Sequence, residues 1–240
     1  MRARSTRRGR VSARRTTENE LRRLGFARVA GVDEVGRGAL AGPVVAAAVV
    51  LPAGDRLVGL RDSKLLSPAA RDRLNDEILR VCLSWSVGLG DRDTIDRLNI
   101  HHASLATMRA AVTALSPLPD FALVDAFRIP RLFIPQSGIV GGDRRCAGIA
   151  AASIVAKVFR DRLMVELHQV DPRYGFDRHK GYGTAEHLAA LARHGYSPAH
   201  RLSFRPSSVF DTIGCAAPEG SARRGGRRAR AADGERRRQT

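Results

Sequence analysis

The sequence is poor in the residues that disulfide-rich or zinc-binding domains need. Its 240 residues include three cysteines, Cys82, Cys146 and Cys215. Their wide spacing fits neither a zinc site nor a disulfide framework, so we expect a reducing compartment, the cytoplasm. The seven histidines offer no pair with metal-site spacing and a suitable third ligand. The adjacent His101 and His102 would point apart on a helix.

Long apolar runs are also missing. The longest run is interrupted at Pro43, which leaves it too short to cross a bilayer, and we expect no membrane association. The residues after the basic N-terminus, 16–28, are polar and charged, so the apolar core of a signal peptide is absent. The sequence has no Gly-x-Ser-x-Gly elbow, and a Ser/His/Asp hydrolase is therefore unsupported.

Positive charge is abundant and unevenly spread. Lysine and arginine outnumber acids by 41 to 24, a net charge of +17. Seven arginines and no acid lie in residues 1–17, and eight arginines against two acids lie in 221–240. We expect one domain over 18–212 between disordered basic tails at 1–17 and 213–240. The tails would either bind nucleic acid in a salt-dependent way or only aid solubility, and both readings stay open.

The hydrophobic pattern predicts alternating strands and helices. An apolar approach and the run Val44 to Leu51 flank a glycine-rich bend, which predicts a hairpin over about 28–51. Ser67 and Pro68 are typical of a helix start. Further strands are expected at 84–90, 121–125 and 137–140, and further helices at 19–24, 93–115, 147–170 and 184–194.

The bend of this hairpin carries the strongest chemical signal. Asp33 and Glu34 precede three glycines within Gly36 to Gly42. The glycine spacing misses the dinucleotide fingerprint, and two acids inside a phosphate loop would repel its ligand. An acid pair followed by the backbone amides of glycines suits a site where a divalent cation binds a phosphodiester. The alternative is an ordinary tight turn with surface acids.

Acids also follow two other apolar runs. Asp125 ends one expected strand, and Asp143 comes shortly after another. Strands of one sheet would bring these ends together with Asp33 and Glu34, and oxygen ligands favour Mg²⁺ or Mn²⁺ over zinc. Asp161 competes for the fourth place, but its basic neighbours on a helix favour an ion pair.

Several blocks of the chain together resemble one family. They are the stretch Ala30 to Pro43, Asp62-Ser63-Lys64, Leu123-Val124-Asp125, Ala150 to Lys157 and His179 to Thr184. In this order they closely resemble the bacterial ribonuclease HII family, type 2 ribonucleases H, across about residues 28–206. The resemblance implies an α/β ribonuclease H-like fold, with a mixed sheet flanked by helices and a helical C-terminal extension that helps to grip the duplex.

The resemblance also implies an activity and its residues. The activity is two-metal endonucleolytic cleavage of RNA in RNA/DNA hybrids, including 5′ to a single ribonucleotide in duplex DNA, leaving 3′-hydroxyl and 5′-phosphate ends. The implied catalytic and metal-binding set, with Mn²⁺ or Mg²⁺, is Asp33, Glu34, Asp125 and Asp143. The implied substrate contacts are Gly36, Arg37, Gly38, Lys64 and Tyr182, and Lys157 and Lys180 are weaker candidates for phosphate contacts.

Some roles stay open at this point. Tyr182 could instead be a half-buried loop aromatic, and His179 could act in acid/base chemistry or make a substrate or structural contact. Two blocks depart from the family pattern: Ala126-Phe127 stands where Gly-Asn is common, and Gly141-Gly142 stands where Lys-Gly is common. The first change could alter a loop, and the second removes a positive charge beside the metal site.

Two alternatives to ribonuclease HII remain. Ribonuclease HIII typically has an additional N-terminal domain, for which the short Arg-rich tail leaves no room. A non-catalytic hybrid-binding protein would have no reason to place four acids where a phosphate approaches. We expect a monomer that binds RNA/DNA hybrids and ribonucleotide-containing duplex DNA. We see no clear Gln-x-x-Leu-x-x-Phe-Phe motif for a sliding clamp.

Overall fold

The computed structural model describes residues 16–54, 57, 59–60 and 66–205. The expected tails and Lys64 therefore lie outside the described residues, except that Thr16 and Thr17 open the first helix, α1 (Thr16–Arg23). Among the described helices, none is both long and apolar enough to cross a bilayer.

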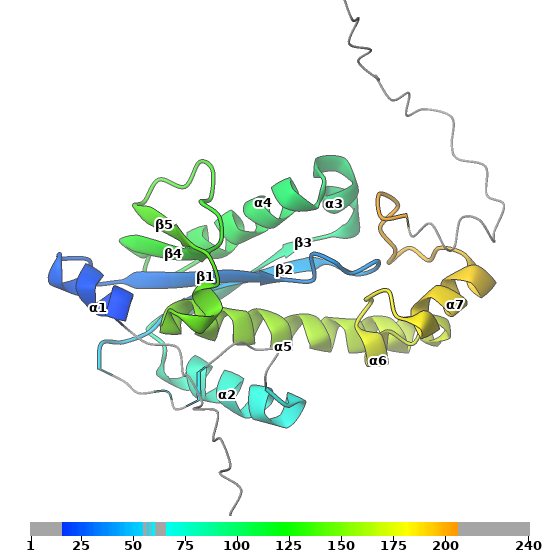
Figure 1. The fold of residues 1–240 in the computed structure, drawn as a ribbon, viewed down its shortest axis with the longest axis horizontal. Coiled ribbons are helices and arrows are strands. Elements are labelled where there is room, and N and C mark those ends of the chain that lie inside the picture. Colours follow the sequence, from blue (N-terminus) through cyan, green and yellow to red (C-terminus); the bar gives the residue numbers. More distant parts are fainter. Residues whose placement is uncertain (1–15, 55–56, 58, 61–65, 206–240) are drawn as a thin grey trace, which may run out of the picture.

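The centre of the fold is a mixed five-stranded sheet in the order β3-β2-β1-β4-β5 (Figure 1). Its strands are β1 (Val29–Val35), β2 (Val44–Val50), β3 (Ser84–Gly90), β4 (Phe121–Asp125) and β5 (Gln136–Ile139). The first three pair antiparallel, whereas β1 with β4 and β4 with β5 pair parallel. The expected hairpin is confirmed, and the last strand begins one residue earlier than expected.

Helices cover both faces of this sheet. The helix α5 (Ala147–Val170) packs on one face together with α2 (Pro68–Val81), and α4 (Ile100–Thr113) packs on the other (Figure 1). Every residue of β2 is buried, because this all-apolar strand lies between two neighbours and two helical layers. Ser67 caps α2 through its side chain, which accepts a hydrogen bond from the Ala70 N–H, as its sequence predicts.

One expected helix is two. The region 93–115 forms α3 (Arg92–Leu98) and α4, with a break at Asn99. Asn99 has a positive φ of 63° and its side chain accepts hydrogen bonds from the His101 and His102 amides, so it caps a new helix rather than continuing the old one. The apolar spacing runs across this break, which is why the hydrophobic pattern alone suggests a single helix.

The contact between α5 and β1 is unusually close. A Cβ added to Gly31 would lie 1.9 Å from the carbonyl carbon of Gly148, so the two backbones touch where both residues lack a side chain. Glu18 of α1 is buried there and accepts a hydrogen bond from the Gly148 amide at 2.8 Å. This anchoring fixes the N-terminal half of α5 against the strand that carries the acid pair.

A helical C-terminal part follows α5, as expected. It contains η3 (Pro172–Tyr174), α6 (Phe176–His179) and α7 (Ala185–His194), which gather at the far end of α5 (Figure 1). Thr184 caps α7 through its side chain. The bend after β1 reaches this part: Leu40 and Ala41 donate hydrogen bonds to the Gly181 carbonyl, and Ala41 forms a β-bridge with His200.

Candidate active site

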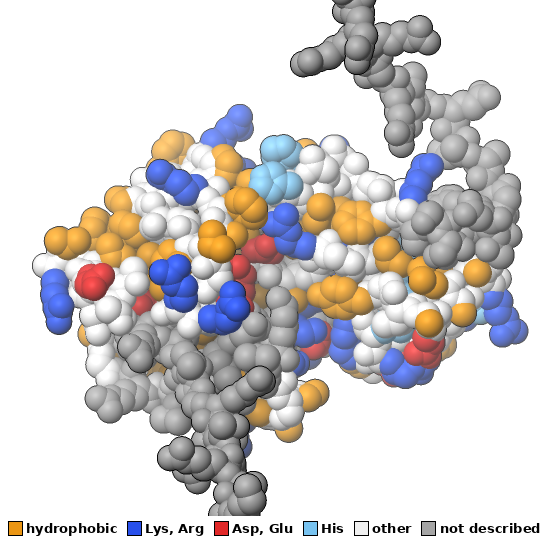
Figure 2. Space-filling model, viewed as in Figure 1, with side chains coloured by type: hydrophobic (Ala, Val, Ile, Leu, Met, Phe, Trp, Pro, Cys, Tyr) orange, Lys and Arg blue, Asp and Glu red, His pale blue; other side chains and the backbone are white. Residues whose placement is uncertain are grey.

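Strand register brings the predicted acids together. Val32 lies opposite Val124 in the parallel pair β1 and β4, so Asp33 and Asp125 follow side by side. Asp143 lies on the short helix η2 (Gly142–Arg144) just after β5. All four acids line one pocket of about 490 Å³, together with Gly36 to Gly38, Ser153, Lys157 and Tyr182. On the face drawn in Figure 2, a small acidic group is bordered by basic and hydrophobic side chains.

The acid pair at the end of β1 is held in an unfavourable environment. Burial raises the pKa of Asp33 well above its usual value, and the charges of Glu34 and Asp125 raise it further. A hydrogen bond with Ser153 opposes this shift. Burial likewise raises the pKa of Glu34, against the opposing charge of Arg37. Carboxylates so placed gain stability from a positive ion between them.

The Glu34 carboxylate is only half satisfied. Its Oε1 accepts a hydrogen bond from Arg37 at 3.1 Å, and its side chain is 10% exposed. Its Oε2 is buried and finds no hydrogen-bond partner among the residues that the structure describes. A buried carboxylate oxygen without a partner is costly, and a cation would satisfy it.

The other two acids are held from the backbone and from a neighbouring arginine. Asp125 Oδ1 accepts a hydrogen bond from the Gly142 amide at 2.7 Å, which ties the end of β4 to η2. Asp143 Oδ1 lies 3.9 Å from Nε of the exposed Arg144. Arg144 thus supplies a positive charge next to Asp143, where the departure at Gly141-Gly142 from the family pattern removes one.

The donor set fits divalent cations. It consists of carboxylate oxygens alone, which suit Mg²⁺ or Mn²⁺, and it contains the unpartnered Glu34 Oε2. As the side chains stand in the described ranges, no three of them converge into a complete metal site. Rotation of Glu34 away from Arg37 would free its Oε1 for a cation as well.

The predicted substrate residues border the same pocket. Gly36, Arg37, Gly38 and Tyr182 all line it. Gly36 has a φ of +90°, a backbone conformation that an L side chain rarely adopts. Tyr182 is half-buried and its ring centroid lies 5.4 Å from the Arg160 guanidinium carbon.

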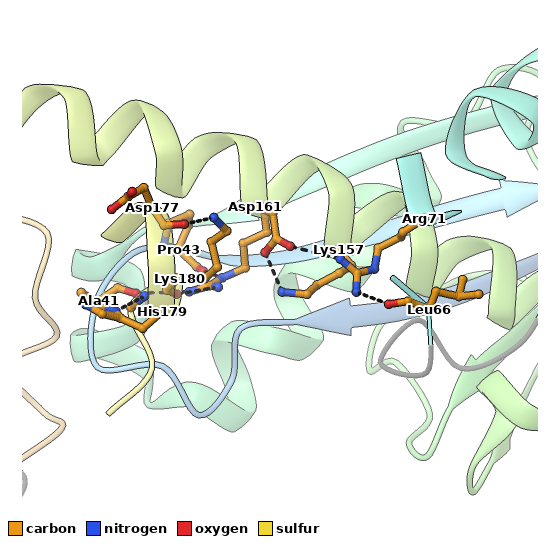
Figure 3. Close-up of polar contacts among 11 residues, drawn as sticks. Ala41, Pro43, Leu66, Arg71, Lys157, Asp161, Asp177, His179 and Lys180 are labelled. Atoms are coloured by element: carbon orange, nitrogen blue, oxygen red, sulfur yellow. Dashed lines mark hydrogen bonds and ion pairs between the residues drawn. The ribbon is translucent and has the colours of Figure 1, made fainter. Parts of the chain in front are cut away.

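Two pocket residues come from α5. Ser153 hydrogen-bonds Asp33, and Lys157 lies one turn further along the same helix face. Lys157 forms an ion pair with Asp161 at 2.6 Å, which Arg71 joins at 3.5 Å (Figure 3). The ion-pair role expected for Asp161 is thereby confirmed. The sequence analysis missed Ser153, although its i, i+4 spacing from Lys157 could have indicated it.

His179 makes structural contacts in this conformation. Its Nδ1 accepts a hydrogen bond from the Gly181 amide, and its Nε2 lies 2.6 Å from the Tyr174 carbonyl oxygen. Both ring nitrogens are therefore occupied by backbone groups of the same segment.

The departure after Asp125 changes a contact near the pocket. Ala126 has a positive φ of 57°, which a glycine would adopt with less strain. Phe127 is 44% exposed, and its ring lies under the Arg37 guanidinium at 5.7 Å and against His101 at 5.2 Å. An aromatic ring of this loop thus contacts an arginine of the pocket.

A mixed sheet in this order, with carboxylates at the ends of neighbouring parallel strands, defines an endonuclease of the ribonuclease H type. The family model for ribonuclease HII matches residues 30–207, and the chain belongs to this family. The enzyme is thus an endonuclease that hydrolyses RNA in RNA/DNA hybrids. Ribonucleases HII from Pelotomaculum thermopropionicum and Burkholderia mallei are each 55% identical to it, over 79% and 77% of this chain and 72% and 87% of the relatives.

Solved structures with this fold include proteins named ribonuclease H2, ribonuclease HII and ribonuclease HIII. Ribonuclease H2 from Pyrococcus horikoshii OT3 has a TM-score of 0.66 at 24% identity, covering 78% of this chain and 97% of that one. Ribonuclease HII in a PCNA complex from Archaeoglobus fulgidus has a TM-score of 0.61 at 25% identity, covering 72% of this chain and 92% of that one. Bst-RNase HIII in complex with Mn²⁺ has a TM-score of 0.63 at 21% identity, covering 80% of this chain and 71% of that one.

Proposed function

We propose that the enzyme cleaves RNA/DNA hybrids and also incises duplex DNA 5′ to a single ribonucleotide, by two-metal-ion catalysis that leaves 3′-hydroxyl and 5′-phosphate ends. The observation that carries this proposal is the pocket that four carboxylates line together with the Gly36 to Gly38 loop. Such an arrangement puts ligands for cations directly beside backbone groups that can contact a sugar.

Asp33, Glu34, Asp125 and Asp143 would hold the cations. When bound, divalent cations supply Lewis acidity at the scissile phosphate, on both the attacking and the departing oxygen. Ser153 holds Asp33 in place, and the Gly142 amide holds Asp125. Lys157, kept near the acids by Asp161, contributes a positive charge that attracts the phosphate.

Recognition of the ribonucleotide falls to other residues that line the same pocket. Discrimination of RNA from DNA requires contact with the 2′-hydroxyl. Gly36, Arg37 and Gly38 follow the acid pair directly, so their backbone can reach the sugar beside the scissile phosphate. Tyr182 would pack on the neighbouring deoxyribose, which gives a preference for an RNA-to-DNA junction.

The proposal extends to the cofactor and to the setting of the reaction. Mg²⁺ and Mn²⁺ both suit an all-oxygen site, and the Bst-RNase HIII structure of the same fold is a complex with Mn²⁺. We place the enzyme in the cytoplasm as a monomer that acts in ribonucleotide excision. The Archaeoglobus protein forms a complex with PCNA, but we propose no clamp binding through residues 213–240 because they lack the motif.

The test is cleavage of a labelled DNA duplex that contains one ribonucleotide, with Mg²⁺, Mn²⁺ or a chelator. Wild type should incise 5′ to the ribonucleotide only with a metal ion. Asp125→Asn, which keeps the acceptor for the Gly142 amide, should lose at least 100-fold in rate. Binding without incision under every condition would instead indicate a hybrid-binding protein.

A further inference from the structure

Two arginines are completely buried behind the Gly36 to Gly38 loop. Arg160 of α5 and Arg201 are both 0% exposed. In the described part of the chain, neither forms an ion pair with a carboxylate. All their hydrogen bonds go to backbone carbonyls. Buried charges without a carboxylate partner are rare and costly, so a specific arrangement of carbonyl groups must offset the cost.

Arg201 holds the two ends of the bend. Its Nη2 donates to the Gly36 carbonyl at 2.7 Å and its Nη1 to the Arg37 carbonyl at 3.0 Å. Its Nε donates to the Gly42 carbonyl at 3.0 Å. One planar guanidinium thus spans the bend, and it points the carbonyls of Gly36 and Arg37 into the protein.

Arg160 joins this bend to the segment that carries Tyr182. It donates to the carbonyls of Pro43 at 3.0 Å and Ala41 at 3.2 Å, and to the Lys180 carbonyl at 3.0 Å. These three partners converge from two segments in Figure 3. Its guanidinium also lies 5.4 Å from the centre of the Tyr182 ring.

The space around Arg160 also explains the glycine beside it. A Cβ on Gly36 would lie 2.2 Å from Arg160 Nε. The bend therefore packs directly on the guanidinium, and any shift of the arginine moves Gly36.

The orientation of the loop follows from these bonds. Arg201 donates hydrogen bonds to the carbonyls of Gly36 and Arg37. Among the described residues, no hydrogen bond engages the amides of Gly36, Arg37 or Gly38. These residues line the acidic pocket. Their amides are thus left for a ligand.

We propose that Arg160 and Arg201 are positioning residues for ribonucleotide recognition, which fix the Gly36 to Gly38 loop and Tyr182 at a set separation without touching the substrate. This inference rests on the proposed function of the pocket. Lysine cannot replace them, because it lacks the planar fork of several donors that bonds three carbonyls at once. Burial, with the nearby charge of Arg160, lowers the pKa of Arg201 to about 9, so it remains charged at neutral pH.

The experiment compares Arg160→Lys and Arg201→Lys with wild type on two substrates. One is duplex DNA with a single ribonucleotide, and the other is a continuous RNA/DNA hybrid. The measured quantity is the ratio of kcat/KM on the two, which does not depend on the fraction of active enzyme. Arg162→Lys is the matched control, because Arg162 is an exposed arginine on the same helix.

We expect each lysine variant to lower this ratio at least fivefold, and the control to leave it unchanged. In a double-mutant cycle, Arg160→Lys should add little to Tyr182→Ala, since the arginine acts through Tyr182. A ratio equal to wild type in both lysine variants would overturn the proposal and assign the arginines to fold stability alone.

The experiment also distinguishes a folding failure of one variant and an inactive wild type from a failure of the proposal. If Arg160→Lys does not fold, Arg201→Lys carries the same test. A wild type that cleaves neither substrate would refute the proposed function rather than this inference.

Discussion

Asp33 and Asp161 are both partly or wholly buried acids near the pocket, but the charged groups around them have opposite signs. Asp33 faces the carboxylates of Glu34 and Asp125. Asp161 instead pairs with Lys157 and Arg71. The sequence already distinguishes a site acid from an ion-pair acid here, because Asp33 follows an apolar run whereas Asp161 lies among basic residues.

These environments predict opposite effects of the same substitution. In a chelator, Asp33→Asn should stabilise the protein by about 1 kcal/mol, because it removes one of three repelling carboxylates. Asp161→Asn should destabilise it by about 1 kcal/mol through loss of two ion pairs. Thermal denaturation measures both.

Addition of Mn²⁺ provides the control for this prediction. It should raise the melting temperature of wild type and of Asp161→Asn, but raise it much less in Asp33→Asn. Equal destabilisation by both substitutions would contradict a strained acid site.

Other residues of the site could not be found from sequence. Arg160 and Arg201 are charged, and charge ordinarily predicts exposure. Their burial depends on carbonyls supplied by a bend more than a hundred residues away. No local pattern records such a contact, whereas the acids follow apolar runs that can be recognised in the sequence.

At the scale of elements, a pair of buried histidines joins α7 to the segment after it. His187 Nε2 and His200 Nε2 are 3.0 Å apart. The Ser197 amide donates to His200 Nδ1, so the His200 proton lies on Nε2 and is donated to His187. His187 Nδ1 then donates to the Tyr182 carbonyl, 2.9 Å away. Each ring is thus neutral and in one tautomer.

This arrangement predicts a loss of stability in acid. Burial, with the neighbouring His187, lowers the pKa of His200 to about 4, against about 6.5 in the unfolded chain. The unfolded state therefore binds more protons between these values, and the free energy of unfolding falls as the pH drops from 6.5 to 4, by at most about 3 kcal/mol.

Urea unfolding at several pH values checks this. His200→Gln should be less stable at pH 7 but should show a flatter dependence on pH. His102→Gln, which changes an exposed histidine, should keep the wild-type slope. A wild-type curve that is flat between pH 6.5 and 4 would contradict the prediction.

The elements themselves were largely predictable. Apolar runs indicated four of the strands and alternating apolar residues indicated β3, and Ser67 and Thr184 indicated helix starts through their capping side chains. The break at Asn99 was missed because it depends on one residue with positive φ rather than on hydrophobic spacing. On β3, Trp85 and Leu89 face outward, since Gly88 lies against the Thr107 carbonyl. Alternation predicts a strand but not which face is buried.

At the scale of the whole molecule, charge is concentrated at the ends of the chain. Residues 1–17 and 221–240 contain fifteen of its arginines. Removal of residues 1–15 and 213–240, which spares α1, should flatten the dependence of hybrid binding on salt, because fewer phosphates are neutralised. The position of cleavage should not change, since the pocket lies within the remaining part.

Binding titrations at several salt concentrations, alongside cleavage mapping, test this. An unaltered salt slope would show that the tails take no part in binding and would favour a role in solubility. A displaced cleavage position would mean that the tails help to align the substrate.

The hydrogen bond from Arg201 to the Gly36 carbonyl joins residues 165 positions apart. During synthesis at roughly 5–20 residues per second, Arg201 therefore leaves the ribosome about 8 to 33 seconds after Gly36. Until then, a nascent chain can contain Asp33, Glu34 and even Asp125 while the Gly36 to Gly38 loop still lacks its hydrogen bonds from Arg201. The Gly36 to Gly38 loop can thus reach its final conformation only after the segment with Arg201, more than 160 residues later, has been made.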